Sequence, residues 1–365
     1  MKIVCHREAL FQGVSAAASV APPRNTKAIL SGVKLSAFRD RTEALATDLE
    51  IAIRSRLQEI IVEEEGEVVL TAKLLVEILR SIESDEVTIE SSGRQCEVRA
   101  ADARYELVTD DPDEFPEIKT GGAGGVSVPR AFLEEMFQRT SFAAARDVGR
   151  YAINGILVEL TEGQIRLVAT DGRRLAVATR ALPDDARDPR RVIVPTKGLQ
   201  ECLRGSEGCE SVRLQLEERR VVLSSDRVEV STKPVEGEFP EYAAVIPAEH
   251  QGQLTVDRDA LLSAVRKVSV MSGDEMRAIQ VDVSEGMLAI SARVEGRGRA
   301  QTELPVETEG QSQFKVDFNP EFVADYLKVL PSGPVIFRYK EAGGAGVFQL
   351  RNSEDIYVVM PITTS

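Results

Sequence analysis

Apolar and polar positions follow the same pattern three times along the chain. Each copy opens with a short alternating strand that runs into a helical period, at residues 3–10, 126–133 and 254–261. A second block of strand and helix recurs at nearly the same spacing, at residues 70–79, 194–203 and 316–327. Because chance rarely keeps several blocks in register, the pattern predicts a triplicated domain.

The remaining segments of each copy alternate with period two and are separated by turn residues. Clear examples are residues 32–38 and 44–47 in the first copy, and 155–160 and 164–169 in the second. Short helices among many such strands predict an α+β fold, with helices packed on one side of antiparallel sheets.

Two stretches of turn-forming residues divide the copies. Residues 120–125 are rich in glycine, and residues 247–252 combine proline, glycine and polar side chains. These stretches predict linkers, so we place three domains at residues 1–122, 123–250 and 251–365.

Charge and composition restrict the classes of function. The chain has 365 residues, with 45 Lys and Arg against 59 Asp and Glu, for a formal net charge of -14. None of the three predicted domains is basic overall, which argues against a protein that grips DNA by neutralising many phosphates. The chain opens without a signal-peptide pattern and contains no long apolar run, so we expect a soluble, cytoplasmic protein that does not enter membranes.

Cysteine and histidine offer little for chemistry. Cys5, Cys96, Cys202 and Cys209 are scattered, and the two histidines do not cluster with them. This spacing fits neither a disulfide framework nor a zinc site, so we expect reduced thiols that pack as small core residues. The sequence therefore predicts no metal site and no cofactor.

Five stretches of sequence carry a more specific signal. They are Tyr-Ala-Ile-Asn-Gly at 151–155, Ala-Thr-Asp-Gly-Arg-Arg-Leu-Ala-Val at 169–177, Val-Ile-Val-Pro-Thr-Lys-Gly at 192–198, Phe-Pro-Glu-Tyr at 239–242 and Tyr-Val-Val-Met-Pro-Ile at 357–362. In this order and at these separations, they resemble the bacterial DNA polymerase III beta subunit, the sliding clamp or processivity factor. The resemblance covers essentially the whole chain.

This resemblance implies three tandem DNA-clamp domains, with helices lining the inside of a ring and antiparallel sheets outside. Two chains would join head to tail as a homodimer and encircle duplex DNA without reading its sequence. The ring would tether the replicative DNA polymerase, so that processivity comes from topology and the clamp itself has no catalytic residues.

The resemblance also implies a peptide-binding groove. It would accept short segments of the polymerase catalytic subunit, the clamp loader, repair polymerases and mismatch-repair proteins. Aliphatic walls, a flexible Met, a Gly that permits close approach and Arg at the rim suit a peptide. On pattern alone, alternating apolar residues at the C-terminal end would fit an ordinary core strand equally well. The matching positions are Ile153, Thr170, Gly172, Arg173, Arg174, Leu175, Pro240, Val245, Val358, Met360 and Ile362.

Basic residues recur on two repeat-equivalent helices. Lys73 and Arg80 are separated by two helical turns, as are Lys197 and Arg204, so each pair shares a helix face. One interpretation is a DNA-facing surface. The alternative is a solvated face on which the intervening glutamates bridge the basic residues.

Under the resemblance, all four of these residues contact DNA, together with Arg24 and Tyr151. It further pairs Tyr105 and Leu107, on an edge strand of the first domain, with Val270 and Met271 of the partner's third domain. An edge strand that pairs in a closed ring no longer invites aggregation.

Two rival functions stay open at this point. A catalytic role would need a carboxylate site, and Asp48, Asp171 and the acidic run 110–114 are candidates. Asp48 and Asp171 occupy equivalent places in two repeats, however, which favours a shared role in closing a turn. The second rival is a triplicated protein-binding scaffold that never encircles DNA.

Overall fold

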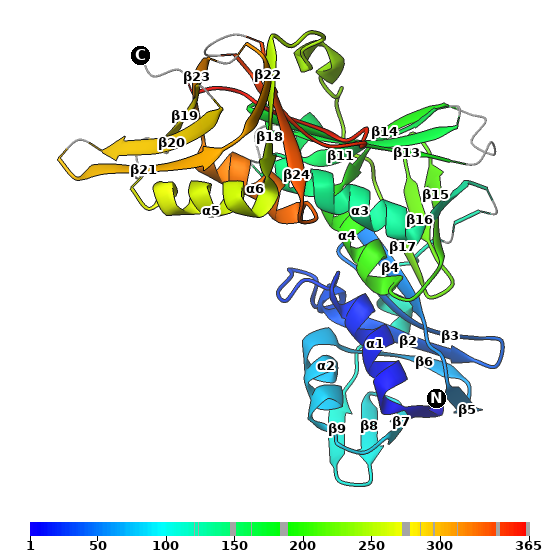
Figure 1. Cartoon of the computed structure of the whole chain (residues 1–365). Coiled ribbons are helices and arrows are strands. Elements are labelled where there is room, and N and C mark those ends of the chain that lie inside the picture. The colour runs from blue at the N-terminus through cyan, green and yellow to red at the C-terminus, as the bar shows by residue number, and fades with distance from the viewer. Residues whose placement is uncertain are drawn as a thin grey trace. The chain divides into compact units, whose positions relative to one another are not determined.

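A computed structural model describes residues 1–119, 121–122, 124–146, 151–161, 163–182, 189–271, 278–284, 286–294, 296–311, 313–340 and 344–362. The chain forms two compact units. Figure 1 colours the chain from blue at the N-terminus to red at the C-terminus. The first unit is Met1–Glu134 with Val194–Pro234, and the second is Glu135–Ile193 with Val235–Ser365. The units divide the predicted central domain, and the three domain boundaries given above stay a prediction.

The first unit contains two sheets whose strand pairs run antiparallel. A five-stranded sheet has the order β5-β1-β7-β8-β9. Its strands are β1 (Lys2–His6), β5 (Ile60–Glu64), β7 (Glu86–Ser92), β8 (Gln95–Ala100) and β9 (Arg104–Val108). An eight-stranded sheet has the order β10-β15-β16-β17-β4-β3-β2-β6. Its strands are β2 (Gly32–Phe38), β3 (Arg41–Thr47), β4 (Ile51–Arg56), β6 (Gly66–Thr71), β10 (Val126–Pro129), β15 (Ser211–Leu216), β16 (Val221–Ser224) and β17 (Val228–Thr232).

Three helices of the first unit pack together on the eight-stranded sheet. Helix α1 (Arg7–Ala18) contacts α2 (Ala72–Ser81), α4 (Thr196–Gly205) and strands β3 and β4, while α4 contacts β17. The sequence explains this packing in α2, where Ala72, Leu75, Ile78 and Leu79 are buried on one stripe. The polar residues of α2 therefore face solvent.

The second unit also contains two sheets. A nine-stranded sheet has the order β14-β11-β12-β13-β26-β25-β24-β18-β22 and a four-stranded sheet has the order β21-β20-β19-β23. The strands of the larger sheet are β11 (Gly155–Thr161), β12 (Gln164–Thr170), β13 (Arg174–Ala181), β14 (Arg190–Pro195), β18 (Gly252–Asp257), β22 (Glu307–Gly310), β24 (Pro334–Tyr339), β25 (Gly346–Leu350) and β26 (Ile356–Val359). Those of the smaller sheet are β19 (Ile279–Ser284), β20 (Met287–Val294), β21 (Gly298–Pro305) and β23 (Phe314–Phe318).

Helices α5 (Arg258–Ser269) and α6 (Pro320–Val329) pack against each other in the second unit. Helix α5 also contacts β20 and β21, and α6 contacts β26. Helix α3 (Arg130–Thr140) crosses the border between the two units in sequence. Among the described residues, no helix is both long and apolar enough to cross a membrane.

The repeat predicted from the sequence is confirmed. Each copy opens with a strand followed at once by a helix, in the pairs β1–α1, β10–α3 and β18–α5. The second block forms the pairs β6–α2, β14–α4 and β23–α6. The α+β fold of three tandem copies with antiparallel sheets is therefore correct.

Candidate functional site

A tight turn joins β12 to β13 and carries four residues of the predicted groove. The hydroxyl of Thr170 donates to the carbonyl of Arg174 at 2.6 Å and accepts from the backbone N–H of Gly172 at 3.0 Å. The carboxylate of Asp171 accepts from the N–H groups of Arg173 and Arg174 at 2.9 and 3.1 Å. Gly172 has a φ of 86°, which glycine adopts without steric cost. The turn is thus closed by its own side chains.

Arg173 and Arg174 face different surroundings. Arg173 is exposed, whereas Arg174 is buried and its guanidinium donates several hydrogen bonds. Its guanidinium donates to Asp171 at 3.0 Å, to Asp325 at 3.0 Å and to the carbonyl of Phe142 at 2.7 Å. Arg173 is therefore available at the surface, while Arg174 holds the turn against the neighbouring α6.

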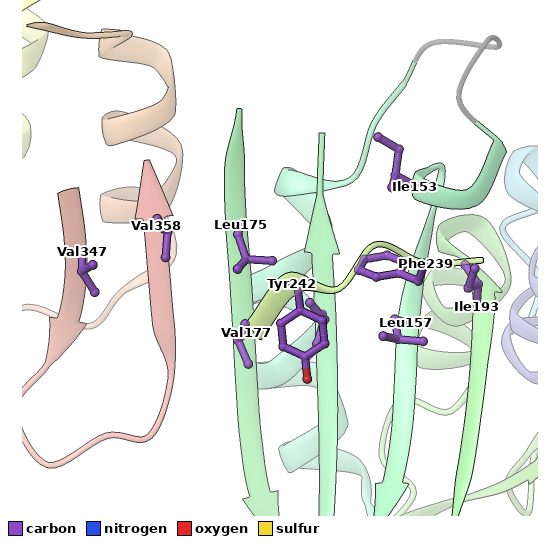
Figure 2. Close-up of a cluster of buried hydrophobic side chains, with 10 residues drawn as sticks. Ile153, Leu157, Leu175, Val177, Ile193, Phe239, Tyr242, Val347 and Val358 are labelled. Atoms are coloured by element: carbon purple, nitrogen blue, oxygen red, sulfur yellow. The ribbon is translucent and has the colours of Figure 1, made fainter. Parts of the chain in front are cut away.

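Beside this turn lies a buried apolar cluster that includes three predicted residues. Figure 2 shows Leu175 and Val177 on β13, with Leu157 on β11 and with Phe239 and Tyr242 on a segment that crosses these strands. The cluster also contains Val168, Ile193 and Val347, and the predicted Ile153 and Val358 complete it. Leu175 lies directly opposite Val358, because β13 pairs with β26.

The sequence analysis missed several members of this cluster as site residues. Leu157 and Val168 lie in the strands predicted at 155–160 and 164–169, so their burial could have been inferred. Val177 and Ile193 fall outside the predicted strands. Tyr242 was part of a recognised motif but was not assigned to the groove. Its hydroxyl donates to Glu159 at 2.5 Å and accepts from Arg166 at 3.1 Å, which fixes the ring over the sheet.

Exposed apolar side chains border the cluster. Val245, at the end of the short 3-10 helix η5 (Tyr242–Val245), is 44% exposed, and Met360 is 39% exposed. Met360 follows β26, and its N–H still donates to the carbonyl of Arg173 at 2.9 Å. The next N–H bond, from Ile362 to the carbonyl of Asp317 at 2.8 Å, fixes the end of this segment. Pro240 is also exposed and follows the buried Phe239 of the cluster.

The predicted DNA-contacting cations are exposed. Lys73 lies 3.8 Å from Glu77 and Arg204 lies 4.0 Å from Glu201, so the intervening glutamates do bridge one member of each pair. Lys197 instead bonds Asp48 at 3.3 Å, and the guanidinium of Arg80 lies 5.8 Å from the ring centroid of Phe11. Arg24 is exposed in the loop after α1, and the side chain of Tyr151 is outside the described residues.

Of the predicted dimer residues, Val270 is exposed and Tyr105, Leu107 and Met271 are partly exposed. Strand β9, which carries Tyr105 and Leu107, is the last strand of its sheet, as expected. The hydroxyl of Tyr105 lies 3.0 Å from that of Ser81, and the adjacent Val108 is 82% exposed. In the second unit, Val270 is 81% exposed just after α5, and Met271 is partly exposed. Strand β21 is a terminal strand of the four-stranded sheet.

Two of the carboxylates considered for a catalytic rival, Asp48 and Asp171, close equivalent turns in two of the three repeats. Asp48 accepts from the N–H groups of Glu50 and Ile51 at 3.0 and 2.7 Å, as Asp171 does with Arg173 and Arg174. The expectation that both residues close turns is confirmed. Within the described ranges, no three His, Cys, Asp or Glu side chains gather in a group that could hold a metal ion.

The four cysteines are free thiols, and Cys5, Cys96 and Cys202 are buried as predicted. Burial raises the pKa of each of these three thiols to about 12. They are therefore neutral at pH 7 and pack as small core residues.

The architecture is that of a DNA clamp. The chain aligns with the crystal structure of the DNA polymerase III subunit beta from Pseudomonas aeruginosa at a TM-score of 0.93 and 29% identity, over 99% of this chain and 100% of that one. A second structure from that organism, bound to griselimycin, gives a TM-score of 0.94 at 29% identity, over 100% of this chain and 99% of that one.

Sequence comparisons agree along the whole chain. The N-terminal, central and C-terminal domain models of the DNA polymerase III beta subunit match residues 1–119, 127–241 and 243–363. The beta sliding clamps of Pseudomonas putida and Caulobacter vibrioides are each 30% identical, over 99% of this chain and 100% of their own length. The chain belongs to the DNA polymerase III beta subunit family.

Proposed function

We propose that this chain is a DNA sliding clamp, a homodimeric ring that encircles duplex DNA and tethers the replicative polymerase. The observation that carries the proposal is the match of three successive clamp domains, in order, along the chain. Such a clamp has no reaction of its own, needs no cofactor and works in the cytoplasm, where the chromosome is replicated.

Charge placement supports a sliding contact with DNA. The chain is acidic overall, at -14, yet the exposed side chains of α2 and α4 include Lys73, Arg80, Lys197 and Arg204. Lys73, Lys197 and Arg204 are paired with Glu77, Asp48 and Glu201, and the guanidinium of Arg80 lies 5.8 Å from the ring centroid of Phe11. A few cations at a ring's inner surface attract phosphates without the many neutralising contacts that would stop movement.

Free sheet edges support ring closure by two chains. An exposed edge such as β9, with Val108 almost fully exposed, is an aggregation hazard unless a partner covers it. Val270 offers an equally exposed apolar side chain on the second unit. A head-to-tail contact of Tyr105 and Leu107 with Val270 and Met271 of the partner subunit would cover both surfaces and close a ring.

The cluster beside the β12–β13 turn supports peptide docking. Met360 and Val245 are exposed apolar side chains over a fixed, buried floor, and Arg173 lies nearby as a charged rim. A short segment with two or three apolar side chains would bury them here. We assign this groove to the polymerase catalytic subunit, the clamp loader, repair polymerases and mismatch-repair proteins, which would compete for it.

A processivity assay tests the proposal. The replicative polymerase from the same organism, with its clamp loader and this chain, should make far longer products per binding event on a primed circular template. A control chain with Val270→Asp and Leu107→Asp should be folded but monomeric, and should lose the gain. Equal product lengths with and without the chain would favour the scaffold that binds proteins but not DNA.

A further inference from the structure

The apolar cluster of the second unit has a repeat-related counterpart in the first. Leu45, Val69 and Phe115 form a small buried cluster, against which Ile29 and Ile118 pack. Its equivalents are Val168, Ile193 and Phe239, with Ile153 and Tyr242, which all belong to the larger cluster. Phe115-Pro116-Glu117 even repeats the sequence of Phe239-Pro240-Glu241. The floor of the proposed groove therefore exists twice.

Strand register shows which side chains beside the two clusters differ between the first and the second unit. In the second unit, Val168 pairs with Leu157 on one side and Val177 on the other. In the first unit, Leu45 pairs in the same way with Lys34 and Arg54. Two aliphatic walls of the cluster are thus replaced by cations, while the apolar floor is retained.

The result is a charged cleft of about 710 Å³ in the first unit, which we call the linker cleft. It is lined by residues of β2, β3, β4 and β6, by the segment 112–119 and by Arg220. The segment 112–119 is held by cations of the cleft itself. The carbonyls of Pro112 and Ile118 accept from Lys34 and Arg54 at 3.3 and 3.1 Å, and that of Lys119 accepts from Arg220.

The described lining of the linker cleft carries five cations and four carboxylates. Glu43 is shared by Arg41 and Arg54, at 3.6 and 3.4 Å, and Glu67 lies 2.7 Å from Lys34. Arg220 adds a cation on the wall, and the covering segment adds Lys119 together with the carboxylates of Asp113 and Glu117, all three exposed. The buried Nε of Arg54 has no hydrogen-bond acceptor among the described residues. Arg41 and Lys119 are the exposed cations of the described lining, so they can meet carboxylates from outside beside an apolar floor.

We propose that the linker cleft is a second docking site, for an extended protein segment that presents an apolar side chain between carboxylates. The proposal rests on the proposed function, because it treats the cleft as a repeat of the peptide groove with altered chemistry. The apolar side chain packs beside Leu45 and Phe115, and the carboxylates bond the exposed Arg41 and Lys119. A clamp with two grooves of unlike chemistry can hold two different partners at once.

Binding of a defined peptide to the full-length dimer tests this site. The probe is a fluorescein-labelled peptide with one leucine between two glutamates, and its control has glutamine at both glutamate positions. Fluorescence anisotropy gives the affinity, and methyl NMR of isoleucine-labelled protein gives the location. Ile29 and Ile118 report on the linker cleft, and Ile153 reports on the other groove.

The decisive variant combines Arg41→Gln with Lys119→Gln, two side chains that are exposed and so not needed for folding. The affinity for the acidic peptide should fall about tenfold, because two charge-assisted hydrogen bonds are lost. Arg219→Gln, an exposed neighbour outside the cleft lining, is the matched control and should leave the affinity within about twofold, as for other surface charges. The peptide should shift the signals of Ile29 and Ile118 alone.

Three results would overturn the proposal. The first is that binding of the acidic peptide does not saturate. The second is that it binds no more tightly than the glutamine control. The third is that it shifts the NMR signal of Ile153 and binds more weakly to a Met360→Ser chain. The last result would place the peptide in the other groove and leave the proposed function intact. Failure of the proposed function itself would be seen separately, as loss of the processivity gain with the unaltered chain.

Discussion

Leu49 and Gly172 occupy the same position of the same turn in two repeats. Each backbone N–H donates at 3.0 Å to the hydroxyl of the threonine two residues before it, Thr47 or Thr170. Both residues have positive φ, 78° for Leu49 and 86° for Gly172. A leucine is therefore held in a conformation that only glycine adopts without strain.

Changing Leu49 to glycine should stabilise the first unit. Relief of the left-handed strain outweighs the added freedom of the unfolded chain, so the free energy of unfolding should rise by about 0.5 kcal/mol. Gly172→Leu should lower it by about 1–2 kcal/mol. Urea unfolding measures both. Leu74→Gly, at a similarly exposed leucine in α2, is the control and should destabilise. If Leu49→Gly and Leu74→Gly lowered the free energy of unfolding equally, the strain at Leu49 would be disproved.

Asp355 should be a main determinant of stability in the second unit. It is 2% exposed and bonds Arg180 at 2.6 and 3.1 Å, Arg139, and the N–H of Thr179 at 3.1 Å. Asp355→Asn removes the buried carboxylate that Arg139 and Arg180 share and leaves them the half-exposed Glu135 as a counter-charge, so it should cost about 2–3 kcal/mol. Glu354→Gln, at the exposed neighbouring residue, should cost almost nothing. A thermal melt of each chain measures the difference, and similar midpoints would rule out a structural role for the cluster.

The same carboxylate predicts how stability depends on pH. Burial opposes the charged form of Asp355, but Arg180 and Arg139 outweigh it and lower the pKa of this carboxyl below its ordinary value. The unfolded chain thus binds the proton first as the pH falls, and the stabilisation is complete only above about pH 4, the ordinary pKa of aspartate. Stability should fall as the pH drops from there through the lowered pKa. This acid-side slope should be smaller in Asp355→Asn, and an unchanged slope would assign it to other groups.

Met360 should anchor partner peptides in the proposed groove. Met360→Ser removes an exposed apolar contact, so binding of the replicative polymerase should weaken by about 1–2 kcal/mol, as at a binding hot spot. Met287→Ser is a matched control, because Met287 is 37% exposed and Met360 is 39% exposed. Surface plasmon resonance with immobilised polymerase measures both. Equal losses, or none, would place the polymerase elsewhere on the chain.

The sequence predicted the features that repeat. The pairing of Thr47-Asp48 with Thr170-Asp171 indicated a shared turn, and the alternation of apolar residues indicated β11, β12 and their equivalents. These are local signals, which depend on neighbouring residues. The repeated order of strand and helix was enough to fix the fold class.

The surroundings of Arg174 could not be predicted, because its partners come from distant parts of the chain. Phe142 lies on another segment, and Asp325 lies on α6, in a different repeat. The sequence pattern shows that an arginine is present but not which carboxylate it meets. Lys34 and Arg54 were missed as cleft residues for the same reason, since only strand register shows that they replace Leu157 and Val177.

Topological linkage to DNA tests the central claim most directly. The clamp loader should place the chain on nicked circular DNA, and gel filtration should recover both together. A nuclease then linearises the circle, and the chain should be released, because a ring slides off a free end. Retention on the linear DNA would show ordinary affinity binding and would contradict a sliding clamp.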